Sequence, residues 1–128
     1  MRNLWLPAAV AVLLSSQAAR AAAVTQENFA LATTADLVAL CNAQPSDPLY
    51  TAAANFCHGF MVGTYRALAE VAPAEQGKKL FCGPAHIPSR NEAVAAFLAW
   101  AAAKPDAAQL SATDGVGEYL MQTYPCRA

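Results

Sequence analysis

Apolar side chains recur along this chain at helical spacing, without the strict alternation of a half-buried strand. In the clearest stretch Phe56, Phe60 and Ala67 stand at i, i+4 and i+11, and other apolar residues widen the stripe. This period predicts an amphipathic helix. Asp47 offers an N-cap acceptor directly before a proline, which suits the first helical position. The pattern therefore predicts a central helix that begins just after Asp47 and ends at Pro73.

Three further stretches with helical spacing have clear start or stop signals. Thr33 is followed three residues later by Asp36, and Ser89 is followed three residues later by Glu92. Both pairs have the form of a capping box, which marks a helix N-terminus. The last stretch stops at Pro125. Together these signals predict an all-α fold, a small helical bundle of about four helices.

Two pairs of glycines fall inside the predicted helices. Gly59 and Gly63 have the small-x-x-x-small spacing that can let a neighbouring helix approach closely. Gly115 and Gly117 lie in the last helix, where glycine is entropically unfavourable. We therefore expect a close helix contact at the first pair and a weakened helix at the second.

The N-terminus has the pattern of a secretory signal peptide. Arg2 gives a positive start, an uncharged apolar run follows, and A-x-A steps end at Ala21 and Ala23. An uncleaved anchor helix is the alternative, but the apolar run is short for a membrane span. We expect residues 1–23 to be removed, by cleavage after Ala21 or Ala23, which leaves residues 24–128 as a single periplasmic domain.

Composition and charge narrow the classes of partner. Loss of the signal peptide removes Arg2 and Arg20, so six basic residues remain against nine acidic ones and the net charge falls to −3. A mildly acidic domain without a basic cluster is a poor candidate for binding nucleic acid or an anionic membrane. Much of the 56% hydrophobic content is alanine, which buries little area per residue. A domain this small therefore gains from cross-links.

The chain has four cysteines, all beyond the signal peptide: Cys41, Cys57, Cys82 and Cys126. An even number in an exported protein indicates two disulfides, and four cysteines allow three connectivities. Cys41 and Cys57 can face each other across an antiparallel helical hairpin. Cys82 and Cys126 lie in proline-containing segments that flank the last two helices. We therefore favour the pairs Cys41–Cys57 and Cys82–Cys126.

Two alternatives would use the cysteines for chemistry. Cys82 and His86 have a ligand-like spacing, and His58 adjoins Cys57, but no paired C-x-x-C is present. A Cys–His nucleophile would need a free thiolate, and four cysteines that pair leave none. The sequence also has no G-x-S-x-G or H-E-x-x-H motif and no phosphate-binding glycine loop. We expect no enzymatic activity, no metal and no cofactor.

The cysteine framework resembles the Rap/Tai family of type VI secretion immunity proteins. The resemblance covers nearly all of the mature chain and rests on short sequence blocks in a fixed order. These are ADLVALC at 35–41, FCHGFMVG at 56–63, FCGP at 81–84 and YPC at 124–126. An amphipathic helix lies between the last two blocks. It implies an all-helical periplasmic protein that forms a homodimer. It also implies that the protein binds and occludes a secreted cell-wall-degrading effector of the amidase class.

The loop before the third helix is the candidate contact surface, because loops on a rigid scaffold carry recognition. A disulfide at Cys82 would lower the entropy lost when this loop, residues 75–90, is ordered on binding. The candidate contact residues are Lys78, Lys79, Phe81, His86 and Arg90. An ordinary solvated loop is the alternative for this segment. A periplasmic stress or chaperone-like binding protein is the alternative function, although the low charged fraction and the four cysteines argue against it.

Overall fold

The computed structural model describes residues 22–71 and 78–126 of the chain. Its elements are η1 (Gln26–Ala30), α1 (Thr34–Cys41), α2 (Tyr50–Val71), α3 (Arg90–Ala103), η2 (Pro105–Gln109) and α4 (Ala112–Thr123). Within those two ranges there are four α-helices and no strand. The predicted all-α fold is confirmed. The predicted signal peptide lies outside the described residues, except for Ala22 and Ala23, and so does the predicted stop at Pro73.

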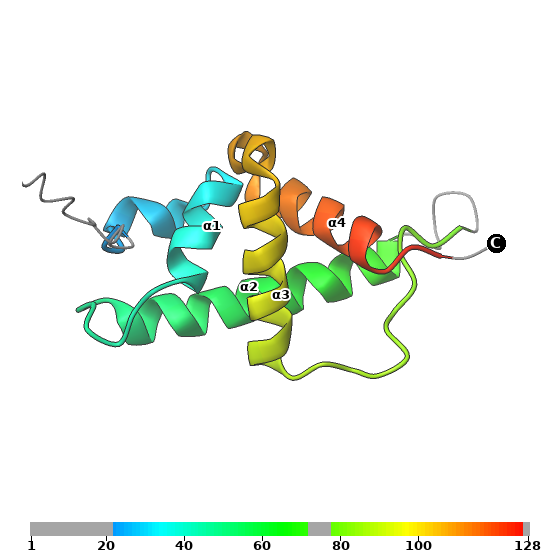
Figure 1. The fold of residues 1–128 in the computed structure, drawn as a ribbon, viewed down its shortest axis with the longest axis horizontal. Helices are drawn as coiled ribbons and strands as arrows, with labels where there is room; N and C mark the ends of the chain where they lie inside the picture. The colour runs from blue at the N-terminus through cyan, green and yellow to red at the C-terminus, as the bar shows by residue number, and fades with distance from the viewer. Residues whose placement is uncertain (1–21, 72–77, 127–128) are drawn as a thin grey trace, which may run out of the picture.

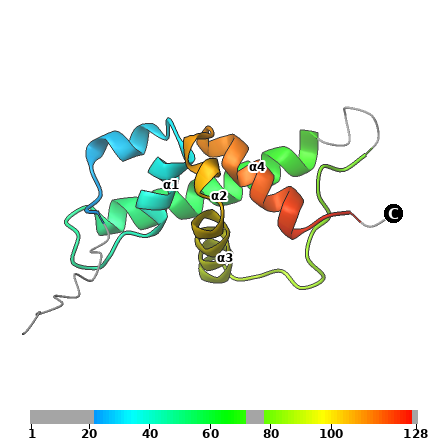
Figure 2. The same ribbon diagram turned by 45° about the horizontal axis from the view of Figure 1, so that its top comes forward.

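The long helix α2 is the base on which the other helices pack. Figure 1 shows α2 running along the length of the domain, with α1 over its N-terminal half and α4 over its C-terminal half. Helix α1 contacts both α2 and α4, and α2 contacts α4. Figures 1 and 2 show α3 crossing α2 steeply, so the arrangement differs from a simple up-and-down bundle. The loop that leads into α3 must therefore travel from the end of α2 back toward its middle.

Both predicted capping boxes are present. The backbone N–H of Asp36 donates to Thr33 Oγ1 at 3.3 Å, and the N–H of Thr33 donates to Asp36 Oδ2 at 2.9 Å. At α3, the N–H of Glu92 donates to Ser89 Oγ at 3.3 Å, and the N–H of Ser89 donates to Glu92 Oε2 at 2.8 Å. Each box satisfies donors that the first turn of a helix cannot pair internally. Helices α1 and α3 therefore begin where the capping signals predict.

Asp47 stands in the turn that leads into α2, and the helix begins slightly later than the proline suggests. The backbone N–H of Leu49 donates to Asp47 Oδ1 at 2.8 Å, and the N–H of Tyr50 donates to the Asp47 carbonyl at 3.0 Å. The regular helix then begins at Tyr50. Before α1, the chain also forms the short helix η1.

The core lies where α1, α2, α3 and α4 meet. Phe97 of α3 is fully buried, and its ring centroid lies 5.6 Å from that of Tyr119 in an edge-to-face contact. The Tyr119 hydroxyl is also buried and has no hydrogen bond of good geometry among the described residues. Burial, and then the neighbouring Tyr124, raises the pKa of Tyr119 well above its usual range. The largest fully buried side chains are Phe97, Leu37, Leu40, Val116, Thr34 and Cys57.

The close helix contact is at the second pair of glycines, whereas the prediction placed it at the first. A Cβ added at Gly59 or Gly63 would meet no atom within 4 Å, and both residues are exposed, so none of the described helices approaches them. The close approach is instead at Gly115, where an added Cβ would collide with Thr34 of α1. The prediction of a close contact at the first pair is wrong. The reason is that spacing alone does not reveal which face of a helix is covered.

The first disulfide joins the first two α-helices. Cys41 at the end of α1 and Cys57 in α2 are bonded, with their Cα atoms 5.1 Å apart. Cys57 is itself part of the core. This confirms the predicted pair and fixes the hairpin that α1 and α2 form.

Candidate partner-binding loop

A segment without regular structure joins α2 to α3, and its described part, residues 78–89, is called the tethered loop below. Figure 1 shows it passing beside the end of α4 before it reaches α3. The predicted contact segment was slightly longer, residues 75–90, and its first three residues lie outside the described ranges. The loop is proline-rich and has few backbone partners of its own, so its position depends on anchors to the helices.

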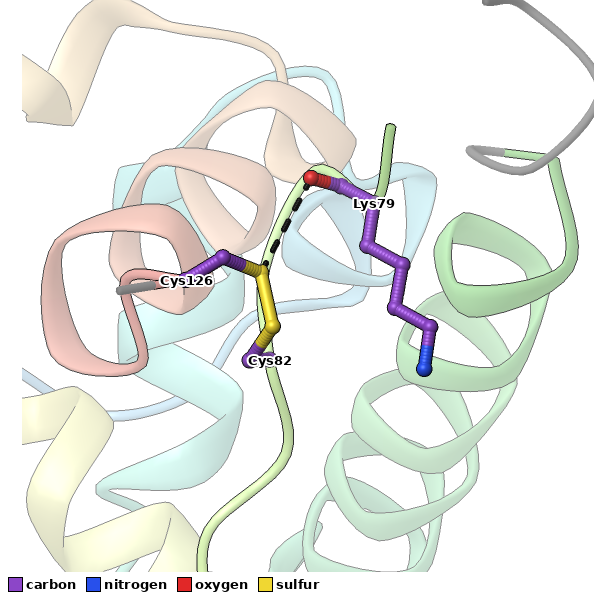
Figure 3. Close-up of a disulfide and its surroundings, with 3 residues drawn as sticks. All are labelled: Lys79, Cys82 and Cys126. Carbon is purple, nitrogen blue, oxygen red and sulfur yellow. Dashed lines mark hydrogen bonds between the residues drawn. A yellow bond between two sulfur atoms is a disulfide. The ribbon is translucent and has the colours of Figure 1, made fainter. Parts of the chain in front are cut away.

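The second disulfide is the main anchor of this loop. Cys82 is bonded to Cys126, with the two Cα atoms 4.8 Å apart, which confirms the predicted pair. The backbone N–H of Cys82 also donates to the carbonyl of Tyr124 at 2.8 Å. The Lys79 carbonyl oxygen lies 3.9 Å from the Cys126 sulfur, and Figure 3 shows the two atoms facing each other. A disulfide sulfur carries no hydrogen to donate, so this last approach is a polar contact only.

Phe81 is the second anchor of the tethered loop. Its side chain is only 5% exposed and belongs to the core. Its ring centroid lies 5.4 Å from that of Tyr65 in α2, a distance typical of aromatic pairs. In this structure Phe81 therefore holds the loop against α2. A direct contact with a partner, as the sequence suggested, would require the ring to leave this position.

The other four predicted contact residues are on the surface. Lys78, Lys79 and His86 are exposed in the tethered loop, and Arg90 is exposed as the first residue of α3. Between Lys78 and Arg90 the sequence has three permanently basic residues and no acidic one. The loop therefore carries a local positive charge on a chain that is acidic elsewhere.

Sequence reasoning missed the most exposed large apolar side chain of the loop. Ile87 is 84% exposed, far more than any other large apolar side chain described in the structure, and Leu80 is 47% exposed. A large aliphatic side chain held in water is unusual enough to suggest an interaction surface. The signal in the sequence was an isoleucine next to Pro88, in a loop rather than on the apolar face of a helix. Exposure itself could not be read from that pattern.

Two hollows lie on the described surface. A small one of about 110 Å³ lies between the tethered loop and α2, and Tyr65, Leu68 and Leu80 line it. A larger and more open one, about 510 Å³, lies between α1 and the end of α3 and is lined mostly by alanine with Val38 and Leu98. No charged side chain lines the larger groove. Only the first hollow lies beside the charged loop.

The disulfides decide against the chemical alternatives. None of the four sulfur atoms is left as a thiolate, so neither a thiolate metal site at Cys82 nor a Cys–His nucleophile fits this structure. Among residues 22–71 and 78–126, no three His, Cys, Asp or Glu side chains gather in a way that could hold a metal ion. Over the same ranges, the helices are too short or too polar to span a membrane.

Comparison with known proteins gives one match. The family model described as Rap1a immunity proteins matches residues 33–126, which include the four cysteines, all four α-helices and the tethered loop. No curated protein and no solved structure matches the chain.

Proposed function

Because the chain belongs to the Rap1a immunity protein family, we propose that it inhibits a secreted cell-wall-degrading effector by binding it through the tethered loop. Family membership implies a partner that is a secreted effector protein and a function without catalysis. The two disulfides fit a protein that acts outside the cytoplasm, since thiols stay reduced inside it. The amidase class of the effector, the periplasmic location and a homodimeric state are the finer parts of this proposal.

The observation that carries the proposal is an exposed Ile87 on a loop with fixed anchors. Interfaces gain most of their binding energy from a few side chains that become fully buried at the centre of the contact. Burying an exposed isoleucine supplies about 2 kcal/mol through the hydrophobic effect. Because Cys82 and Phe81 already hold the loop in place, little conformational entropy is lost when it binds.

The basic residues of the loop and of the first position of α3 indicate the kind of surface that Ile87 would meet. His86 and Arg90 lie close to it in the chain, and Lys78 and Lys79 lie at the other end of the loop. Positive charge around an apolar contact favours an acidic partner surface, raises the association rate and discriminates against basic surfaces. We propose that the effector presents an apolar cavity with an acidic rim, and that the loop blocks access to it.

The test exports the product of the gene next to this one to the periplasm of a host and measures lysis. Co-expression of the full chain should prevent lysis. A variant without residues 2–23 should fail to protect in cells and yet bind the purified effector, because the two proteins would then be in different compartments. Equal lysis with and without this protein would overturn the proposed function.

Light scattering of the mature protein tests the proposed dimer separately, since a monomer could still protect.

A further inference from the structure

The N-terminal segment enters the fold at Val24. Ala22 and Ala23 are exposed, whereas Val24 is 7% exposed and its side chain belongs to the core. The backbone nitrogen of Val24 donates to Asp47 Oδ2 at 2.8 Å. Val24 is therefore the first buried side chain of the described residues, although Thr25, Gln26 and Glu27 after it are exposed.

Asp47 links this boundary to the longest helix. One of its carboxylate oxygens accepts from Val24, and the other accepts from the backbone N–H of Leu49 at 2.8 Å. Its own carbonyl accepts from the N–H of Tyr50, the first residue of α2. A single carboxylate thus joins the start of the folded chain to the start of α2.

The sequence allows cleavage after Ala21 or after Ala23, because both positions complete an A-x-A step. We infer that the leader is cleaved between Ala23 and Val24, and that the new α-ammonium group of Val24 forms an ion pair with Asp47. In this hydrolysis one water adds across the peptide bond. The C–N bond breaks, Ala23 leaves as a carboxylate, and the Val24 nitrogen becomes an ammonium group. The leader peptidase of the export pathway supplies the catalysis.

The atom that gains the charge is the nitrogen already facing the carboxylate. The amide already donates to an ionised carboxylate, and cleavage would add a full positive charge at that nitrogen, so that Coulomb attraction is added to the hydrogen bond. Cleavage after Ala21 would instead leave a neutral amide at Val24 and would place the charge on Ala22, which is exposed. The geometry thus assigns one of the two possible sites, and it makes processing a step that strengthens the fold. This inference requires that the protein is exported, but it does not depend on the proposed binding to an effector.

The first experiment is the intact mass and N-terminal sequence of the disulfide-bonded protein recovered from the periplasm. The chain should begin Val24-Thr25-Gln26. A chain that begins at Ala22, or at any other residue, would overturn the assigned cleavage site.

The second experiment tests the ion pair by comparing chains that begin at Val24 and at Ala22, both released from a cleavable fusion. The Asp47→Asn substitution keeps a cap acceptor for Leu49 but removes the charge. It should raise the unfolding equilibrium constant about two- to fivefold more in the Val24 chain than in the Ala22 chain. Asp106→Asn, at an exposed position of η2, should act equally on both chains. An equal effect of Asp47→Asn on the two chains would overturn the ion pair.

Discussion

Thr34 fills the space beside Gly115 that any larger residue would need for its Cβ. A Cβ built at Gly115 would lie 2.7 Å from Thr34 Cγ2 and 2.9 Å from Thr34 Cβ. The Thr34 hydroxyl donates toward the carbonyls of Leu110 and Ser111, at 3.2 and 3.0 Å, and its backbone N–H also donates to Leu110. The start of α1 is therefore locked against the start of α4.

This contact predicts opposite effects for two glycine substitutions. Gly115→Ala should destabilise the protein by about 1–3 kcal/mol, because Thr34 is enclosed and cannot move aside easily. Gly59→Ala should stabilise it by about 0.5–1 kcal/mol, because its position is open and alanine is the better helix former. Urea unfolding of both variants measures the difference. A stabilised Gly115→Ala protein would show that the two helices are not in close contact.

Two phenylalanines should differ in their contribution to stability. Phe97 is fully buried, whereas Phe60 is only partly buried and packs at the edge of the core. Phe97→Ala should lower the free energy of unfolding by about 3–5 kcal/mol, the cost of a large core cavity. Phe60→Ala should cost clearly less. Thermal or chemical unfolding of the pair checks this, and an equal cost would mean that Phe60 is buried in an interface such as a dimer contact.

Both disulfides should contribute to the free energy of unfolding, but only one of them should affect effector binding. In the chain-entropy model, loss of the Cys82–Cys126 bond costs about 4 kcal/mol and loss of the Cys41–Cys57 bond about 3 kcal/mol, because the first closes the longer loop. Each pair is replaced by alanines in turn. Only removal of the Cys82–Cys126 bond should weaken effector binding under conditions where the protein stays folded, since only that bond fixes the tethered loop. Equal binding by both variants would show that the loop does not need its tether.

The lowered pKa of Asp36 should make the free energy of unfolding depend on pH. The side chain of Asn28 donates to it at 3.0 Å, and this bond, followed by those from Thr33, holds the pKa of Asp36 below its usual value. Such a group contributes stability that is complete above its unfolded pKa and is lost as the pH falls through its folded pKa. Asp36→Asn should therefore be less stable than the natural protein at about pH 7, and the gap should narrow below about pH 4. Urea midpoints at several pH values test this, with the exposed Asp106→Asn as a charge-matched control.

Features set by neighbours in the chain were predictable from the sequence. The capping boxes at Thr33 and Ser89 depend on residues three positions apart, and the sequence shows them directly. The disulfide pairs also followed, because the expected helix order left Cys41 opposite Cys57 and Cys82 near the C-terminus.

Features set by distant packing were not predictable. Gly59 and Gly115 each lie inside a helix and close to a second glycine, and only the placement of α1 makes Gly115 a close contact. In the tethered loop, Phe81 and Ile87 are both large apolar residues in a proline-rich segment. Phe81 is buried because it packs against Tyr65 of α2, whereas no described residue covers Ile87.

The most direct test of the proposed mechanism is the affinity of the mature protein for its effector when Ile87 is replaced. Ile87→Asp should weaken binding at least about tenfold and leave the free energy of unfolding within about 0.5 kcal/mol of the natural value. Tyr50→Asp, in the first turn of α2 and 37% exposed, places the same charge away from the tethered loop and should bind normally. Undiminished binding by the folded Ile87→Asp protein, or an equal loss in both variants, would contradict the proposal that this loop recognises the effector.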